Sequence, residues 1–162
     1  MLKQLVFAAL AAALALPAAA QDPVQIAAVQ KGRMDCAKCN LFQADFSYTD
    51  MHGRNFAGAR LRQSELSLTE FDNANLSGVN LSIANAFGAR LAHANLSGAD
   101  LKGGVFVGAY FGGANLKGAQ LTGANFAGAE LETAKGLTQA QLNTACGDAT
   151  TTLPTGLKIP NC

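Results

Sequence analysis

The sequence predicts an all-β fold in which the chain turns a corner every five residues and stacks into coils. Two observations carry this prediction. A large apolar residue recurs at every fifth position from Leu41 to Leu131, and Ala86 is the one small exception among nineteen. A small residue, most often Ala, precedes each large one by two positions, with Arg54 as the misfit. Because a period of five fits neither a helix nor a flat strand, the backbone must bend regularly.

Glycine and proline are distributed as tight, hydrogen-bonded corners require. Glycine follows the large residue by two positions in eleven of the nineteen repeats, for example at Gly78 and Gly98, and glycine adopts backbone conformations that strain other residues. Proline is absent between Pro23 and Pro154. Since proline lacks the N–H group that a ladder of stacked strands needs, its absence is consistent with such a ladder.

Several stretches carry a family resemblance. Residues 74–78 and 94–98 read Ala-Asn-Leu-Ser-Gly, and residues 114–118 read Ala-Asn-Leu-Lys-Gly. With this motif, A(D/N)LXX, the array over residues 39–133 resembles pentapeptide-repeat proteins. The resemblance implies a right-handed quadrilateral β-helix with four pentapeptides per coil, so nineteen repeats make about 4.75 coils. It also implies that the large and small apolar residues point inward.

The first twenty residues have the pattern of a secretory signal peptide. Lys3 gives a positive start, residues 5–16 are apolar, and Pro17 interrupts the run before small residues. An apolar run of twelve residues is shorter than the roughly 20 that a membrane-spanning helix needs. We expect cleavage near Ala20 and Gln21, and a periplasmic or secreted mature chain without a transmembrane segment.

Both ends of the array are expected to be capped, because open solenoid ends expose strand edges that promote aggregation. Residues 21–38 form an N-terminal lead-in with a short helical stretch that ends near Gly32. In residues 134–162, Thr138 and Gln141 have the spacing of a capping box. A short helix over residues 139–146 is therefore expected to cover the last coil, followed by a tail.

Four cysteines, an even number in a chain expected to be exported, favour disulfides. Cys36 and Cys39 lie at one end of the array, and Cys146 and Cys162 lie at the other. The ends are roughly 20 Å apart at the spacing of stacked strands, whereas the Cα atoms of bonded cysteines lie within about 7 Å. We therefore expect the pairs Cys36–Cys39 and Cys146–Cys162, the second of which would tie the tail to the capping helix.

The first pair leaves alternatives open. The CxxC spacing of Cys36 and Cys39 also occurs in thiol redox proteins. A thiol redox role for this pair is therefore an alternative to a structural disulfide. Haem attachment would require His after the second cysteine, where the chain has Asn40. A four-cysteine zinc site fails on the distance between the two ends. We expect no cofactor and no metal.

Two outer faces of the four-sided coil are candidate interaction surfaces. Every twentieth residue stacks on the same face, so acidic residues collect on one face and apolar residues on another. The acidic set is Asp50, Glu70, Asp72, Glu130 and Glu132, and the apolar set is Leu68, Phe87, Val105 and Val107. An exposed apolar patch indicates a partner or self-association, whereas the charges are also explained as a solvated surface.

Composition and charge exclude several classes of function. The chain has 14% charged residues and a formal charge of +1, without the basic excess of nucleic-acid-binding proteins. The repeat brings together no catalytic triad, phosphate loop or metal-ligand set. We expect a non-enzymatic exported scaffold that presents a rigid face to a protein or cell-envelope partner, or to a second copy. Some members of the family that this chain resembles mimic DNA and protect gyrase, a role that the lack of strong negative charge opposes.

Overall fold

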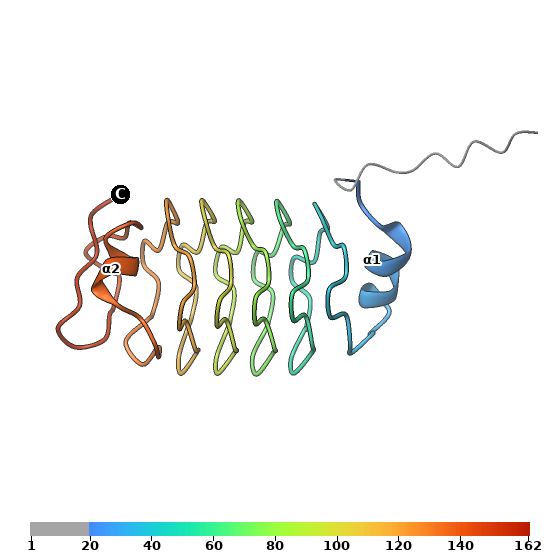
Figure 1. Ribbon diagram of the computed structural model, residues 1–162, viewed down its shortest axis with the longest axis horizontal. Helices are drawn as coiled ribbons and strands as arrows, with labels where there is room; N and C mark the ends of the chain where they lie inside the picture. The colour runs from blue at the N-terminus through green and yellow to red at the C-terminus, as the bar shows by residue number, and fades with distance from the viewer. Residues whose placement is uncertain (1–19) are drawn as a thin grey trace, which may run out of the picture.

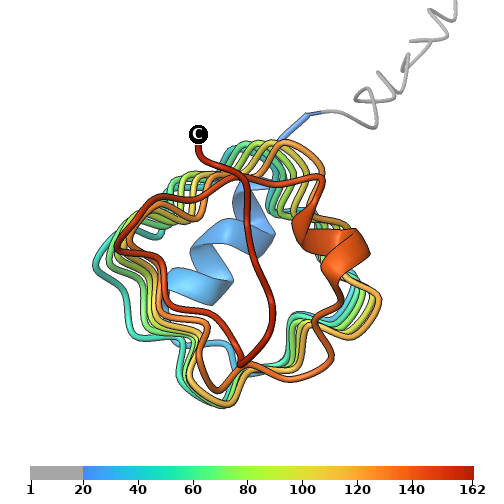
Figure 2. The same ribbon diagram turned by 90° about the vertical axis from the view of Figure 1, so that its left-hand side faces the viewer.

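The chain winds into a rod of stacked coils with a helix at each end (Figure 1). The computed structural model describes residues 20–162, so the expected signal peptide lies outside the described residues except for its last position. Helix α1 spans Pro23–Gln30 and helix α2 spans Gln139–Leu142. Seen along the rod, the coils superpose into a four-sided outline, with α1 behind them and the C-terminal tail crossing the near end (Figure 2).

Parallel bridges between residues twenty apart set the register of the coils. Asn40 bridges Arg60, Arg60 bridges Asn80, and the same step recurs throughout the array. Twenty residues are four pentapeptides, which is the coil length that the family resemblance implies. Each bridge involves one residue from each coil, and residues 20–162 contain no longer strand, because the corners leave straight segments of only a few residues.

Four columns of bridges define four faces. The first face holds Asn40, Arg60, Asn80, Asp100 and Gln120; the second holds Asp45, Glu65, Asn85, Val105, Asn125 and Cys146; the third holds Asp50, Glu70, Arg90, Tyr110, Glu130 and Thr152; the fourth holds Asp35, Asn55, Asn75, Asn95, Asn115 and Lys135. The ladder therefore begins before residue 39 and continues beyond residue 133.

Each corner is a four-residue turn. The N–H of Ala44 donates to the carbonyl of Leu41 at 3.1 Å, and equivalent bonds recur in later repeats. The third residue of the turn has positive φ at all nineteen corner positions from 38 to 128, and eight of these residues are not glycine. They include Leu68 (φ 56°) and Ile83 (φ 58°), although positive φ is uncommon outside glycine and is an outlier for a β-branched residue.

Asn and Asp side chains cap many of these corners. The Oδ1 atom of Asn75 accepts from the N–H of Ser77, two residues on, at 3.2 Å, a contact that short amide and carboxylate side chains reach readily. Asn side chains of the same column also donate hydrogen bonds to one another between successive coils. On the fourth face, Nδ2 of Asn75 donates to Oδ1 of Asn55 at 3.1 Å, and Nδ2 of Asn115 donates to Asn95 at 3.3 Å.

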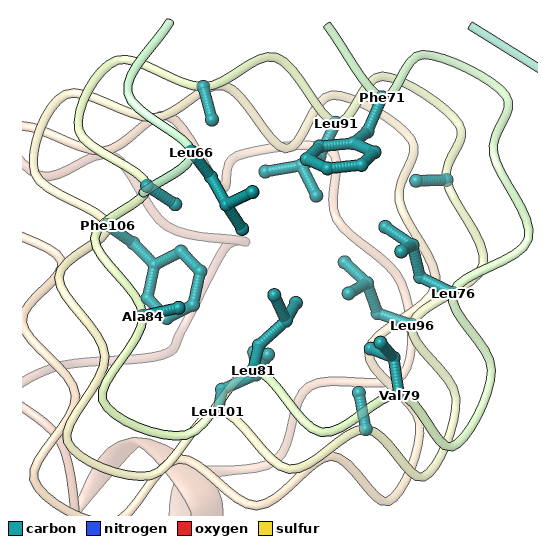
Figure 3. Close-up of a cluster of buried hydrophobic side chains, with 14 of the residues drawn as sticks. Leu66, Phe71, Leu76, Val79, Leu81, Ala84, Leu91, Leu96, Leu101 and Phe106 are labelled. Carbon is teal, nitrogen blue, oxygen red and sulfur yellow. The ribbon is translucent and has the colours of Figure 1, made fainter. Parts of the chain in front are cut away.

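The large residues fill the interior from all four sides. Figure 3 shows Leu66, Phe71, Leu76 and Leu81 pointing inward, and the last three are followed one coil further on by Leu91, Leu96 and Leu101. Further along, the rings of Phe106 and Phe126 stack with their centroids 5.3 Å apart. Ala86 is also buried, at 2% exposure. Burial of each large side chain contributes about 1.5–3 kcal/mol before entropy, so the narrow core is the main source of stability.

Helix α1 is fixed to the first coil. Asp22 caps it by accepting from the N–H groups of Val24 and Gln25. At its other end, Arg54 donates to the carbonyl oxygens of Val29 and Asp50, each at 2.8 Å. Arg54 thus departs from the column of small residues because it links the helix to the coil.

Helix α2 is shorter than expected. The capping box of Thr138 and Gln141 is present, but the helix ends at Leu142 rather than at residue 146. The reason is that Cys146 returns to the ladder: its N–H donates to the carbonyl of Ala124 at 3.0 Å, and its carbonyl accepts from Phe126 at 2.7 Å. A residue cannot make both of these inter-coil bonds and continue a helix.

Candidate functional site

Exposed apolar side chains gather along the second face. Ile83 lies at its corner with the first face, and Leu68, Phe87 and Val107 lie at its corner with the third. On the second face, Leu68, Phe87 and Val105 are 45%, 51% and 37% exposed, and Val107 is half-buried. Ile83, at the corner just before Phe87, is 53% exposed. We call Leu68, Ile83, Phe87, Val105 and Val107 the apolar corner.

Backbone bonds place these residues on neighbouring coils. The N–H of Leu68 donates to the carbonyl of Phe87 at 2.8 Å, and the N–H of Gly88 donates to the carbonyl of Val107 at 2.9 Å. The Leu68 side chain lies over Gly88, where an added Cβ would come 2.7 Å from Cδ2. The apolar corner therefore spans three consecutive coils on a hydrogen-bonded framework.

Two residues of the apolar corner keep an unfavourable backbone. Leu68 and Ile83 occupy turn positions that are glycine in most repeats, with φ of 56° and 58°. A left-handed conformation costs a residue with a side chain roughly 1–2 kcal/mol, and such strain is concentrated at functional sites. The period of five assigns Ile83 to the first face and so separates it from Leu68 and Phe87. The signal in the sequence is a β-branched residue at a position where glycine prevails.

The third face carries an ion pair as well as acids. A guanidinium nitrogen of Arg90 lies 2.8 Å from a carboxylate oxygen of Asp72, and the other oxygen of Asp72 accepts from the N–H of Ala92. The hydrogen bond and the charge of Asp72 raise the pKa of Arg90 above its ordinary value. The Arg90 guanidinium also lies 5.4 Å from the ring centroid of Tyr110. Asp72 is thus partly neutralised.

The remaining acids of the third face form two separate groups. Asp50 and Glu70 bridge each other on the first coils, and both are exposed. Glu130 and Glu132 lie near the other end, beside a hollow of about 120 Å³. The hollow is lined by Tyr110, Gly112, Glu130, Glu132, Thr133 and Thr152. The two groups of acids therefore do not make one continuous patch.

The first disulfide bridges the first corner from the inside. Cys36 and Cys39 are bonded, with their Cα atoms 5.2 Å apart. Cys36 occupies the inward position of a large residue and Cys39 that of a small one, and they are only 1% and 7% exposed. Both nevertheless line a hollow of about 320 Å³ at the N-terminal end, together with Gln25, Arg33, Asp35, Ala37 and Lys38.

The second disulfide joins the ladder to the chain terminus. Cys146 and Cys162 are bonded, with their Cα atoms 4.8 Å apart. Next to this bond, Gly147 bridges Asn161 and its N–H donates to the carbonyl of Pro160 at 2.8 Å. The disulfide thus holds the tail across the last coil. Both disulfides are the ones predicted from the distance between the two ends of the array.

The described part of the chain lacks both a metal-binding cluster and a helix that could span a membrane. Between residues 20 and 162, no three His, Cys, Asp or Glu side chains are grouped so that they could hold a metal ion. In that same region, neither helix has the length and apolar character needed to cross a membrane.

A family model described as pentapeptide repeats, in eight copies, matches residues 33–63, 64–103 and 105–135. The chain belongs to the pentapeptide-repeat family. Proteins of this family fold into right-handed quadrilateral β-helices, in agreement with the step of twenty residues between bridges. No curated protein matches the chain.

Solved pentapeptide-repeat proteins resemble this one. Rfr23 from the cyanobacterium Cyanothece 51142 is 28% identical, with a TM-score of 0.51 over 82% of this chain and 99% of that one. HetL, involved in heterocyst differentiation regulation in Nostoc sp. strain PCC 7120, is 24% identical, with a TM-score of 0.35 over 74% and 62%. QnrB1, a plasmid-mediated fluoroquinolone resistance protein, is 18% identical, with a TM-score of 0.36 over 78% and 82%. Only the likeness to Rfr23 is close enough to support the fold.

Proposed function

We propose that this pentapeptide-repeat protein is an exported, non-enzymatic scaffold whose apolar corner binds a protein partner. The observation that carries the proposal is the half-exposure of Leu68, Ile83 and Phe87 on adjoining segments. Exposed apolar side chains that adjoin one another are typical of interaction sites. Since the ladder already fixes their backbone, little conformational entropy would be lost when a partner binds.

The strained corners give independent support. Glycine at positions 68 and 83 would remove the cost of positive φ, as it does at most other corners. Leu68 and Ile83 instead place apolar side chains on the surface at a cost in stability. A binding role accounts for this combination of backbone strain and apolar exposure.

Export is the second part of the proposal. The pattern of residues 1–20 is that of a signal peptide, and disulfides such as Cys36–Cys39 and Cys146–Cys162 persist in oxidising compartments. The mature chain would begin near Gln21 and act in the periplasm or outside the cell. In this proposal the coils have the right-handed quadrilateral form of the family.

The acids of the third face have a secondary role in the proposal. Asp50, Glu70, Glu130 and Glu132 would steer a partner with basic residues rather than hold it, because exposed charges affect association rates more than affinity. A formal charge of +1 opposes both nucleic-acid binding and mimicry of DNA. A second copy of the chain is the alternative occupant of the apolar corner.

The proposal is tested by capture with matched variants. Immobilised residues 21–162 would be incubated with an envelope extract and with culture medium from the source organism, and bound proteins quantified by mass spectrometry. We expect the double variant Leu68→Ser/Phe87→Ser to lose a protein that the wild type retains. The control Val24→Ser/Met34→Ser removes two other exposed apolar side chains, 77% and 57% exposed, and should retain it. Equal capture by both variants would contradict the proposal.

A further inference from the structure

The corner that contains the first disulfide is held without it. The N–H of Cys36 donates to the carbonyl of Asn55 at 2.8 Å, and the N–H of Cys39 donates to the carbonyl of Cys36 at 3.1 Å. The equivalent turn from Leu41 to Ala44 makes the same kind of bond at 3.1 Å and has no disulfide. Breaking the Cys36–Cys39 bond would therefore leave this corner folded.

The two disulfides also differ in how much chain they constrain. Cys36 and Cys39 are three positions apart, whereas Cys146 and Cys162 are sixteen apart. A disulfide that closes a short loop removes less entropy from the unfolded chain. The first bond is therefore expected to contribute less to stability than the second.

The hollow at the N-terminal end is lined by both residues of the first disulfide. Cys39, at 7% exposure, is more accessible than Cys36, at 1%. Arg33 and Lys38 line the hollow with one carboxylate, Asp35. The lining thus carries two positively charged side chains and one negatively charged side chain. This net positive charge attracts an anionic ligand and stabilises a thiolate.

We propose that Cys36–Cys39 is a redox-active disulfide that exchanges with a small thiol bearing carboxylates. The proposal is independent of partner binding at the apolar corner. A thiolate of the substrate attacks Sγ of Cys39, the sulfur–sulfur bond breaks, and Cys36 leaves as a thiolate. A second substrate thiolate then attacks the substrate sulfur of the mixed disulfide and releases Cys39. Two substrate thiols are thereby oxidised to one substrate disulfide. Their two electrons and two protons reduce Cys36–Cys39 to two thiols.

Reduced glutathione serves as the probe in the first experiment. The folded protein is equilibrated in buffers of increasing ratio of reduced to oxidised glutathione, acid-quenched, alkylated and mapped by mass spectrometry, with circular dichroism recorded in parallel. We expect Cys36 and Cys39 to become reduced while the spectrum is unchanged, and the reduced pair to transfer its electrons back to oxidised glutathione. If the pair stays oxidised until the protein unfolds, or if its reduction unfolds the chain, the proposal is wrong.

The double variant Arg33→Gln/Lys38→Gln tests the role of the cations. We expect exchange with glutathione to be slowed roughly threefold, and exchange with cysteamine, a cationic thiol, to be slowed less, because only glutathione also loses attraction to the two cations. For the reduced pair, the pH midpoint of alkylation by neutral iodoacetamide should rise in the variant, because the thiolate loses two stabilising charges. Equal slowing with both thiols would contradict recognition of a thiol bearing carboxylates, and an unchanged midpoint would contradict stabilisation of the thiolate by Arg33 and Lys38.

Discussion

The side chain of Leu68 lies over Gly88, the corner residue of the next coil. A Cβ added at Gly88 would come 2.7 Å from Cδ2 of Leu68, closer than packed carbon atoms approach. The same relation links His93 to Gly113, where the added Cβ would come 2.5 Å from Nδ1. At these two corners the side chain packs over a glycine one coil further along, so the two corners of each pair are coupled.

Gly88→Ala should destabilise the protein more than Gly78→Ala. Both glycines have φ of +62°, but an added Cβ at Gly78 has nothing within 4 Å. Gly78→Ala should therefore lower the free energy of unfolding by about 1 kcal/mol from backbone strain alone. Gly88→Ala should cost up to about 1 kcal/mol more, because the half-exposed side chain of Leu68 must change its rotamer. Urea denaturation measures both values.

The double variant Leu68→Ala/Gly88→Ala separates the two causes of this loss. With Leu68 shortened, the extra cost of Gly88→Ala should disappear and leave only the strain that Gly78→Ala shows. If the cost of Gly88→Ala is the same with and without Leu68, the contact does not explain it.

Ile83→Asn should leave stability unchanged or raise the free energy of unfolding by up to about 1 kcal/mol. Asn tolerates positive φ better than a β-branched residue does, and Ile83 is half-exposed. As a control, Ile26→Asn on α1, where the side chain packs against the core, should be destabilising by about 1–3 kcal/mol. Thermal and urea unfolding give both values. A large loss at position 83 would show that Ile83 stabilises the fold rather than serving a surface role.

Removing the second disulfide should cost more stability than removing the first. Cys146→Ala/Cys162→Ala releases a closed loop with a separation of sixteen residues and should cost about 3 kcal/mol. Cys36→Ala/Cys39→Ala opens a separation of only three and should cost about 2 kcal/mol. The free energies of unfolding in urea check the order. A larger loss at the first pair would support a structural role for it.

Acid should weaken the C-terminal end through Asp148. The hydroxyl of Thr150 and the N–H groups of Gly128 and Thr150 donate to its carboxylate and lower its pKa from 3.8 to about 2. Because the folded-state pKa is the lower one, this stabilisation is present above pH 3.8 and is lost as the pH falls through about 2.

Asp148→Asn gives the corresponding test. The melting temperature of the wild type should exceed that of the variant near neutral pH, and the difference should shrink from about pH 4 down to about pH 2. A difference that does not change with pH would show that the ionised carboxylate of Asp148 does not stabilise the fold.

The register of the coils could be predicted from the regular period of five together with the four repeats per coil that the family resemblance implies. Four steps of five residues return the chain to the same face, so Asn75 meets Asn55 and Asn95 as expected. The capping box at Thr138 was also predictable, since it depends on local spacing. Both features depend on the spacing of residues along the chain, which can be seen directly in the sequence.

Other features depend on contacts that a repeat pattern does not record. Arg54 breaks the column of small residues because it bonds to Val29 on α1, and the position of that helix follows from the end of the solenoid. Ile83 belongs to the apolar corner although the period places it on the first face. The end of α2 is set by the return of Cys146 to the ladder. In each case a tertiary contact outweighs a local preference.

Site-specific photocrosslinking tests the central claim most directly. A benzophenone side chain would replace Phe87 in one variant and Lys117, an exposed residue of the fourth face, in another, and each would be irradiated in the source organism. The account predicts a discrete adduct with another protein from position 87 and none with that protein from position 117. The same adduct from both positions, or an adduct only from position 117, would contradict a partner-binding role for the apolar corner.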